Sequence, residues 1–290
     1  MKVGIELETL CEIRPENGVG DYHDGYIVNE LDSIGCGNWT AEQDSSLNPV
    51  DEESGIEFVS PPFAFNDRNI LKLSDAVQDI RDKFDARVNQ SCGTHISVSL
   101  PALDSQQYRR LYYVGRLLQQ GMYASTGSIT RETGCYAMPL KELPYTGDDA
   151  IAEGVYSSED RCNWLNLVNV EKANRKYTGT RSRCEYRIFS GTTDSLRVIT
   201  WTQLCVCLTK YAIRTDSPLP VQPISRPKGV GEGRYYLDCL LKTIGWRDGT
   251  CSDYEENSIL NMSAAAKVVE DLADTYDSKK YGARNRGGIL

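Results

Sequence analysis

Apolar residues recur at helical spacing in several long segments of the chain. In residues 66–88 they recur at steps of three or four, which predicts a helix with one buried face. A second helix is expected to begin at Asp104, a residue type that often caps helices, and a third to run from about Ser195 to Ile213. Residues 234–244 and 258–276 also have helical spacing. The inner stripes expected for the first two helices are Ile70, Leu73, Val77, Ile80, Phe84 and Val88, and Tyr108, Leu111, Tyr112, Gly115, Leu118 and Met122.

Between these helices lie short segments in which polar and apolar residues alternate, as they do in half-buried strands. The segments are VGIELE, GIEFVS, GTHISVSL, NWLNLVNV and CEYRIF. We expect an antiparallel sheet with helices packed on its dry face and a wet, acidic, concave face opposite. The predicted fold class is therefore α+β. Residues 1–215 would form the core, and residues 216–290 a proline-rich connection and a C-terminal helical extension packed on the same domain.

The net charge, the lack of a long apolar segment and the spacing of the cysteines argue against several classes of function. A net charge of -9 argues against binding to nucleic acid, because such binding depends on clustered Lys and Arg. No segment approaches the length of a membrane span, and the first strand begins at residue 1, so we expect no leader and a cytoplasmic protein. The ten cysteines are scattered and form no CxxC pair, so we expect neither a zinc site nor a disulfide framework. Cys92, Cys162 and Cys184 are interpreted as small apolar residues.

Two glutamates of the first strand carry the first chemical signal. Glu6 and Glu8 are two residues apart, so both side chains leave the same face, while Ile5 and Leu7 point to the core. Carboxylates held this close repel each other unless solvent or a cation screens them, and their hard oxygens suit Mg²⁺ or Mn²⁺. A solvated strand face is the simpler interpretation of this pair alone, and it stays open at this point.

Other strands supply further acidic residues. Glu57 lies in SGIEFVSPPF, and Glu185 and Arg187 share one face of CEYRIF. A carboxylate beside a guanidinium suits phosphate oxygens, although a surface ion pair of small energetic value would have the same pattern.

The chain has two histidines, His23 and His95. His95 shares its face with Ser97 and Ser99, so we expect it on the wet face, where a neutral imidazole could complete a metal shell or contact a phosphate. A half-buried histidine that only packs is the alternative. His23 lies in the loop DYHDGY and is interpreted as surface.

The order of these motifs carries more information than any one of them. GIELE, QDSSL, GIEFVSPP, CGTHISV, NWLNLVNV and CEYRIFSGT follow one another from Val3 to Trp201, and this series resembles the amidoligase family. The resemblance implies kinship with glutamate-cysteine ligases and glutamine synthetases, and a catalytic fold like that of glutamine synthetase and the guanido kinases. It also implies an ATP-dependent carboxylate-amine ligase that forms an amide through an acyl phosphate.

The resemblance also implies roles for single residues. Glu6, His95 and Glu185 would bind the nucleotide's metal, and Glu8, Asp44 and Glu57 a metal near the acceptor carboxylate. Arg187 would steady the transferring phosphoryl group. The residues expected to take part in catalysis are thus Arg187, Glu57 and His95, with ATP and Mg²⁺ or Mn²⁺ as cofactors. The expected partners are a small-molecule or peptide carboxylate and an amine, with no nucleic acid and no membrane, and a homo-oligomer stays open.

Some observations leave alternatives. Many relatives have a second histidine where this chain has Ser97. A non-catalytic nucleotide-binding or assembly protein is therefore kept as an alternative function. A phosphotransferase like the guanidino kinases, which would keep the fold and change the reaction, is a second alternative. Arg131 and Arg161 are further candidates to hold ATP phosphate or a substrate carboxylate, or are surface arginines. Asn166 must be hydrogen-bonded if its strand is buried. Trp39 is interpreted as a packed loop aromatic rather than a base-stacking residue.

Overall fold

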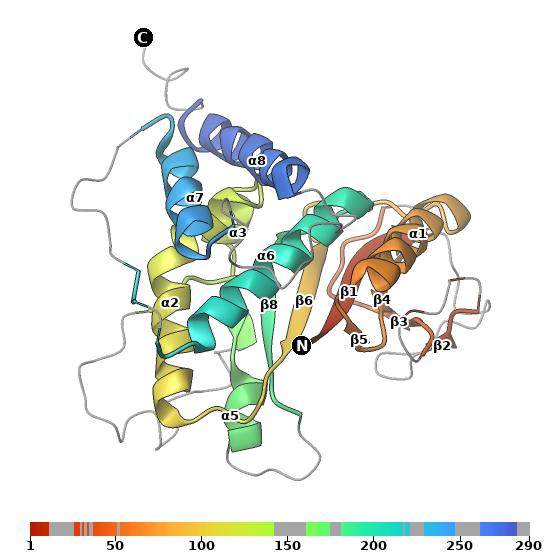
Figure 1. The fold of residues 1–290 in the computed structure, drawn as a ribbon. Helices are drawn as coiled ribbons and strands as arrows, with labels where there is room; N and C mark the ends of the chain where they lie inside the picture. The colour runs from red at the N-terminus through yellow and green to blue at the C-terminus, as the bar shows by residue number, and fades with distance from the viewer. Residues whose placement is uncertain are drawn as a thin grey trace, which may run out of the picture. The chain divides into compact units, whose positions relative to one another are not determined.

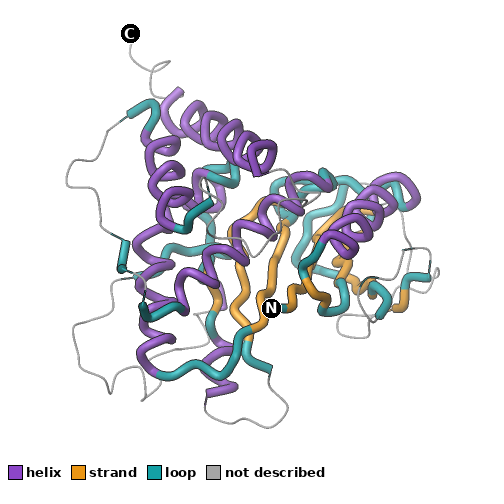
Figure 2. The backbone as a smooth tube through the Cα atoms, in the orientation of Figure 1, coloured by secondary structure: helices purple, strands orange, loops and turns teal. Residues whose placement is uncertain are grey.

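The computed structural model describes residues 1–11, 26–29, 31, 34, 37–50, 53–141, 161–174, 181–216, 218–220, 229–246 and 262–282. The chain forms two compact units, Met1–Ser99 with Phe189–Gln203 and Leu100–Ile188 with Leu204–Leu290. Each contains helices and strands (Figures 1 and 2), so the α+β class is confirmed.

The first unit is built on a sheet whose central strand is β1. Strands follow the order β2-β3-β4-β1-β6, and the short strand β5 also pairs with β1. All of these pairs are antiparallel, as predicted. The bounds are β1 Lys2–Cys11, β2 Tyr26–Ile27, β3 Thr40–Gln43, β4 Ser54–Val59, β5 Phe63–Ala64 and β6 Gly93–Ser99.

The dry face of this sheet has the predicted alternation. Ile5 and Leu7 of β1 are buried, and so is Phe58, the partner of Leu7 on β4. Phe58 contacts the ring of Phe84, which directly follows helix α1 (Asp67–Lys83), so α1 covers this face (Figure 1). Burial of these side chains supplies the main stabilising term of the unit.

Helix α1 is shorter than the apolar spacing predicted. It begins after Asn66, whose side chain accepts a hydrogen bond from the Asn69 N–H, and ends at Lys83. Asp85 has φ 45°, in the left-handed region, so the helical backbone cannot continue to Val88. Val88 is exposed, and its predicted place on the inner stripe is wrong.

The second unit contains a helical cluster beside two paired strands. Helix α2 (Ser105–Ala124) packs on α7 (Glu232–Thr243) and α8 (Met262–Gly282), as Figure 1 shows. Asp104 caps α2 as predicted: its side chain accepts the Gln107 N–H, and the side chain of Gln107 accepts the Asp104 N–H in return. The whole predicted inner stripe of α2 is buried. The remaining elements are α3 Thr130–Thr133, β7 Leu165–Asn166, α5 Val168–Asn174 and β8 Arg183–Ser190.

Helix α6 (Ser195–Ile213) has the predicted bounds, and its first nine residues belong to the first unit. There the hydroxyl of Ser195 bonds to that of Ser74 on α1, and the ring of Trp201 stacks on Phe189. In the second unit, Thr209 of the same helix bonds to the hydroxyl of Tyr186 on β8.

The prediction of one long strand over NWLNLVNV is wrong. Only Leu165 and Asn166 form a strand, and a helix follows from Val168. The side-chain oxygen of Asn166 accepts a hydrogen bond from the Val168 N–H at 3.0 Å, which turns the backbone between the two elements. This local bond ends the strand where apolar alternation alone would continue it.

Three further sequence predictions have a structural counterpart. Among the described residues, every helix is too short or too polar to cross a bilayer. Cys92 and Cys184 are buried, as expected, while Cys162 is half-buried. In the proline-rich connection, Arg110 donates to the Pro218 carbonyl at 3.1 Å, but residues 221–228 lie outside the described residues. The boundary predicted at residue 215 stays a prediction.

Candidate functional site

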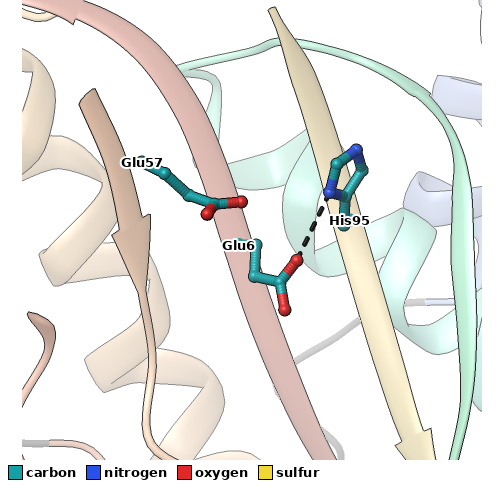
Figure 3. A group of neighbouring side chains, drawn as sticks. All are labelled: Glu6, Glu57 and His95. Atoms are coloured by element: carbon teal, nitrogen blue, oxygen red, sulfur yellow. Dashed lines mark hydrogen bonds and ion pairs between the residues drawn. The ribbon is translucent and has the colours of Figure 1, made fainter. Parts of the chain in front are cut away.

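Three side chains from adjacent strands meet on one face of the first unit's sheet. Glu57 comes from β4, Glu6 from the central strand β1 and His95 from β6 (Figure 3). Each offers one ligand atom, and these atoms all lie within 4.8 Å of one another. The strand register explains the meeting, because Glu6 lies opposite His95 and Glu57 lies opposite Glu8.

His95 lies between two carboxylates. Its Nδ1 is 3.3 Å from Oε2 of Glu6, and its Nε2 is 3.4 Å from Oε1 of Glu8. The residue is only 3% exposed and Glu8 only 8%, so this part of the face is not the wet surface that we predicted. At low exposure the two contacts are less screened by water than surface ion pairs would be.

Glu57 has the clearest electrostatic perturbation of the site. Burial, and then the nearby negative charge of Glu6, raise the pKa of Glu57 from 4.5 to about 8. Glu8 and Asp44 raise this pKa further, while His95 acts in the opposite direction. A group whose ionised form is this unfavourable in the protein alone is suited to a bound cation, which would offset both burial and repulsion.

The other predicted ligands of the first unit have different surroundings. One oxygen of Glu8 accepts the Gly93 N–H at 2.5 Å, in addition to the His95 contact of the other oxygen. Asp44 lies in the loop after β3, where its Oδ1 accepts the Ser46 N–H at 2.8 Å. Its charge is close enough to act on Glu57. Among the described residues, the group of close ligand atoms contains neither Glu8 nor Asp44.

Glu185 and Arg187 lie on β8 in the second unit, with their side chains paired as the alternation predicted. Arg187 Nη1 is 2.5 Å from Oε1 of Glu185, and the Asn166 amide donates to the other oxygen at 2.7 Å. The pair is largely buried, with side-chain exposures of 21% for Arg187 and 10% for Glu185. It is therefore not the weak surface ion pair considered as its alternative. Asn166 is hydrogen-bonded through both ends of its amide, as expected.

Three of the weaker candidates, Arg131, Arg161 and Trp39, lie in the described part of the chain. Arg131 is buried on α3, Arg161 is exposed, and their binding roles stay predictions. Trp39 is fully buried, as a packed loop aromatic should be. His23 lies outside the described residues.

Sequence reasoning missed the Gly93 N–H as a partner of Glu8 and Asn166 as a partner of Glu185. Neither contact leaves a spacing signal, because each joins residues far apart in the chain. The alternating pattern did place Glu6 and Glu8 on one face of their strand, but it could not indicate which strands are neighbours.

The donor set agrees with a divalent metal. Two carboxylates supply hard oxygen ligands and the imidazole supplies a nitrogen, a combination that suits Mn²⁺ and, with water completing the shell, Mg²⁺. Burial and the charge of Glu6 raise the pKa of Glu57, and a cation bound beside it would act in the opposite direction.

Residues 1–142 match the family model described as "Putative amidoligase enzyme". The resemblance to the amidoligase family is confirmed over these residues. These residues, 1–142, are called the amidoligase segment below. The segment includes Glu6, Glu57 and His95, so the cluster lies within the part of the chain that the family model matches. The motifs around Glu185 and Arg187 lie beyond it, and their resemblance stays a prediction. A search among curated proteins found no match.

Proposed function

We propose that this chain is an ATP-dependent carboxylate-amine ligase that uses a divalent metal at Glu6, Glu57 and His95. The observation that carries the proposal is the meeting of these three ligand atoms within the amidoligase segment. The family description supports ligase activity in general. ATP, the acyl phosphate and the metal are parts of the proposal.

In this proposal each residue has a physical task. Glu6, Glu57 and His95 would hold the cation, and a bound cation would supply charge neutralisation for the phosphate oxygens. Glu185 holds the guanidinium of Arg187 in the second unit, and the phosphate-binding role that the family resemblance implies for Arg187 stays a prediction. No nucleophilic side chain is needed, because the substrate carboxylate itself attacks phosphorus.

The reaction proceeds in two displacements. An oxygen of the substrate carboxylate attacks the γ-phosphorus, the bond to the β-phosphate oxygen breaks, and ADP leaves. The amine nitrogen then attacks the carbonyl carbon of the acyl phosphate. The bond between this carbon and the bridging oxygen breaks, phosphate leaves with the bridging oxygen, and the nitrogen releases one proton. The products are an amide, ADP and phosphate.

A turnover assay tests the proposal. Purified protein with ATP and Mg²⁺ should release ADP and phosphate only when an acid and an amine from a mixed library are both supplied, and mass spectrometry should find their amide. Glu6→Ala should abolish this release. Asp82→Asn removes one negative charge at an exposed site on α1 and should leave the rate unchanged.

Three outcomes would contradict the proposal in different ways. Turnover that survives Glu6→Ala would show that the metal is held elsewhere. Nucleotide binding without product across the library would favour the non-catalytic alternative. A stable phosphoramidate in place of an amide would indicate a phosphotransferase.

A further inference from the structure

We propose that Glu8 is a positioning residue that accepts the Nε2–H of His95 and so leaves Nδ1 of His95 as the metal ligand. This inference rests on the metal site of the proposed function. It gives Glu8 a role different from the direct ligand that the family resemblance implies.

The two oxygens of Glu8 already have distinct partners. Oε2 accepts the backbone N–H of Gly93 at 2.5 Å, two residues before His95 on the same strand. Oε1 lies 3.4 Å from Nε2 of His95. Because the backbone of β6 fixes one oxygen, the other is held in a constant position relative to the imidazole.

The two ring nitrogens of His95 face different surroundings. Nδ1 lies 3.3 Å from Oε2 of Glu6. Glu6, Glu57 and His95 together form the group of close ligand atoms (Figure 3). Nε2 lies on the side of Glu8. A nitrogen that binds a metal must be unprotonated, and a neutral imidazole carries its proton on the other nitrogen. A cation bound by Glu6, Glu57 and Nδ1 therefore requires the proton on Nε2, facing Glu8.

This arrangement is one in which a carboxylate orients a metal-binding histidine. An acceptor behind the ring fixes its tautomer and rotation and increases the basicity of the ligating nitrogen. With a side-chain exposure of only 10% for Glu8, water competes little for the contact. Among the described residues, the close ligand group also omits Glu8, as a supporting role would require.

Glu8→Gln separates the positioning role from a structural one. An amide has one accepting end and one donating end, and the Gly93 N–H can only donate, so it selects the amide oxygen. The NH₂ group then faces Nε2 of His95 and bonds to it only if Nε2 is unprotonated. The substitution should therefore move the proton to Nδ1, the nitrogen needed by the metal.

Nitrogen-15 NMR of the histidine rings provides the test. The chain has only two histidines, and His23→Gln would leave the signals of His95 alone. In metal-free and Mg²⁺-loaded wild type at pH 8, Nε2 should be protonated, and Nδ1 unprotonated once Mg²⁺ is bound. In metal-free Glu8→Gln, Nε2 should be unprotonated. The Kd for Mn²⁺ should rise about 10–100-fold with the number of bound ions unchanged.

Two further variants serve as controls for this test. Glu42→Gln removes one charge from the residue opposite Glu57 on β3, and should leave the His95 tautomer unchanged. Glu8→Asp keeps the charge and both acceptors, so it should retain protonated Nε2 and lose less Mn²⁺ affinity than the amide. If Glu8→Gln does not fold, the tautomer of His95 and the Mn²⁺ affinity can be measured in Glu8→Asp instead.

The outcomes distinguish this inference from the proposed function. If Glu8→Gln binds one ion fewer and leaves the His95 tautomer unchanged, Glu8 is a ligand and the inference is wrong. An unchanged tautomer with unchanged affinity would also overturn it. If wild-type protein binds neither Mg²⁺ nor Mn²⁺, the proposed metal site fails, while the tautomer in the metal-free variants still decides whether Glu8 positions the ring.

Discussion

Glu57→Gln should make the metal-free protein more stable at alkaline pH while it weakens metal binding. Glu57 is half-buried and lies beside the negative charge of Glu6, and partial burial followed by this charge raises the pKa of Glu57 from 4.5 to about 8. Glutamine has nearly the same shape and no charge, so it removes the cost of ionisation. It also removes one of the three proposed ligands.

The sign and size of the effect follow from this shift. Because the pKa is higher in the folded than in the unfolded protein, the folded state is favoured below about pH 4.5 and loses that advantage as the pH rises through 8. At 1.36 kcal/mol for each pKa unit, the full cost at alkaline pH is at most about 5 kcal/mol. Repulsion shared with Glu6 and the burial of an amide reduce the expected gain to about 2–4 kcal/mol.

Urea unfolding at two pH values in the presence of a chelator measures this gain. At pH 5 the free energies of unfolding of wild type and variant should nearly coincide, and at pH 8.5 the variant should be more stable by the amount above. Asp82→Asn, with the same change of charge at a side chain that is 61% exposed, should differ from wild type by less than about 0.5 kcal/mol at both.

A difference that is equal at pH 5 and pH 8.5 would refute the reasoning, because it would have no connection to the ionisation of Glu57. Adding Mn²⁺ at pH 8.5 extends the experiment. A ligand at 100 times its Kd stabilises by about 2.7 kcal/mol, and this gain should be much smaller in the variant.

Three predictions concern the scaffold, and urea unfolding at neutral pH measures each. Asp104→Ala removes the N-cap of α2 and should cost about 1 kcal/mol; no loss would mean that the cap is replaced by water. Gly121→Ala would place a Cβ 2.6 Å from the Tyr236 carbonyl oxygen, so it should cost about 1–3 kcal/mol, whereas a gain would show that α7 can shift. Asp277 of α8 accepts two backbone N–H groups at the start of α7, and Asp277→Asn should cost about 1–3 kcal/mol; a neutral result would contradict a stabilising role for these bonds.

Local signals in the sequence predicted the long helices α1, α2 and α6. Asp104 caps α2 and α6 begins and ends at the predicted residues, while the cap of α1, Asn66, was not predicted as one. Such signals act within a few residues, so a single sequence contains them. The end of α1 was missed because the apolar spacing continues to Val88, whereas Asp85 has a left-handed backbone just after the helix.

The candidate site depended more on non-local pairing. Alternation correctly placed Glu6 and Glu8 on one face and predicted a shared face for His95. It could not reveal that β1 lies between β4 and β6, which is what brings Glu57 and His95 to Glu6. It also missed the burial of His95, since a strand pattern shows which side a residue takes but not what covers that side.

The position of Glu6 and Glu8 on the central strand also bears on how the chain selects one fold. A slip of β1 by one residue against its neighbours would turn every side chain to the opposite face. Both carboxylates would then enter the apolar layer that contains Phe58, at a cost of several kcal/mol for each charge. The acids of the candidate metal site would thus penalise misregistered sheets during folding, before any ligand is bound. Variants that replace both with apolar residues would lose this discrimination and become prone to alternative strand pairing and aggregation.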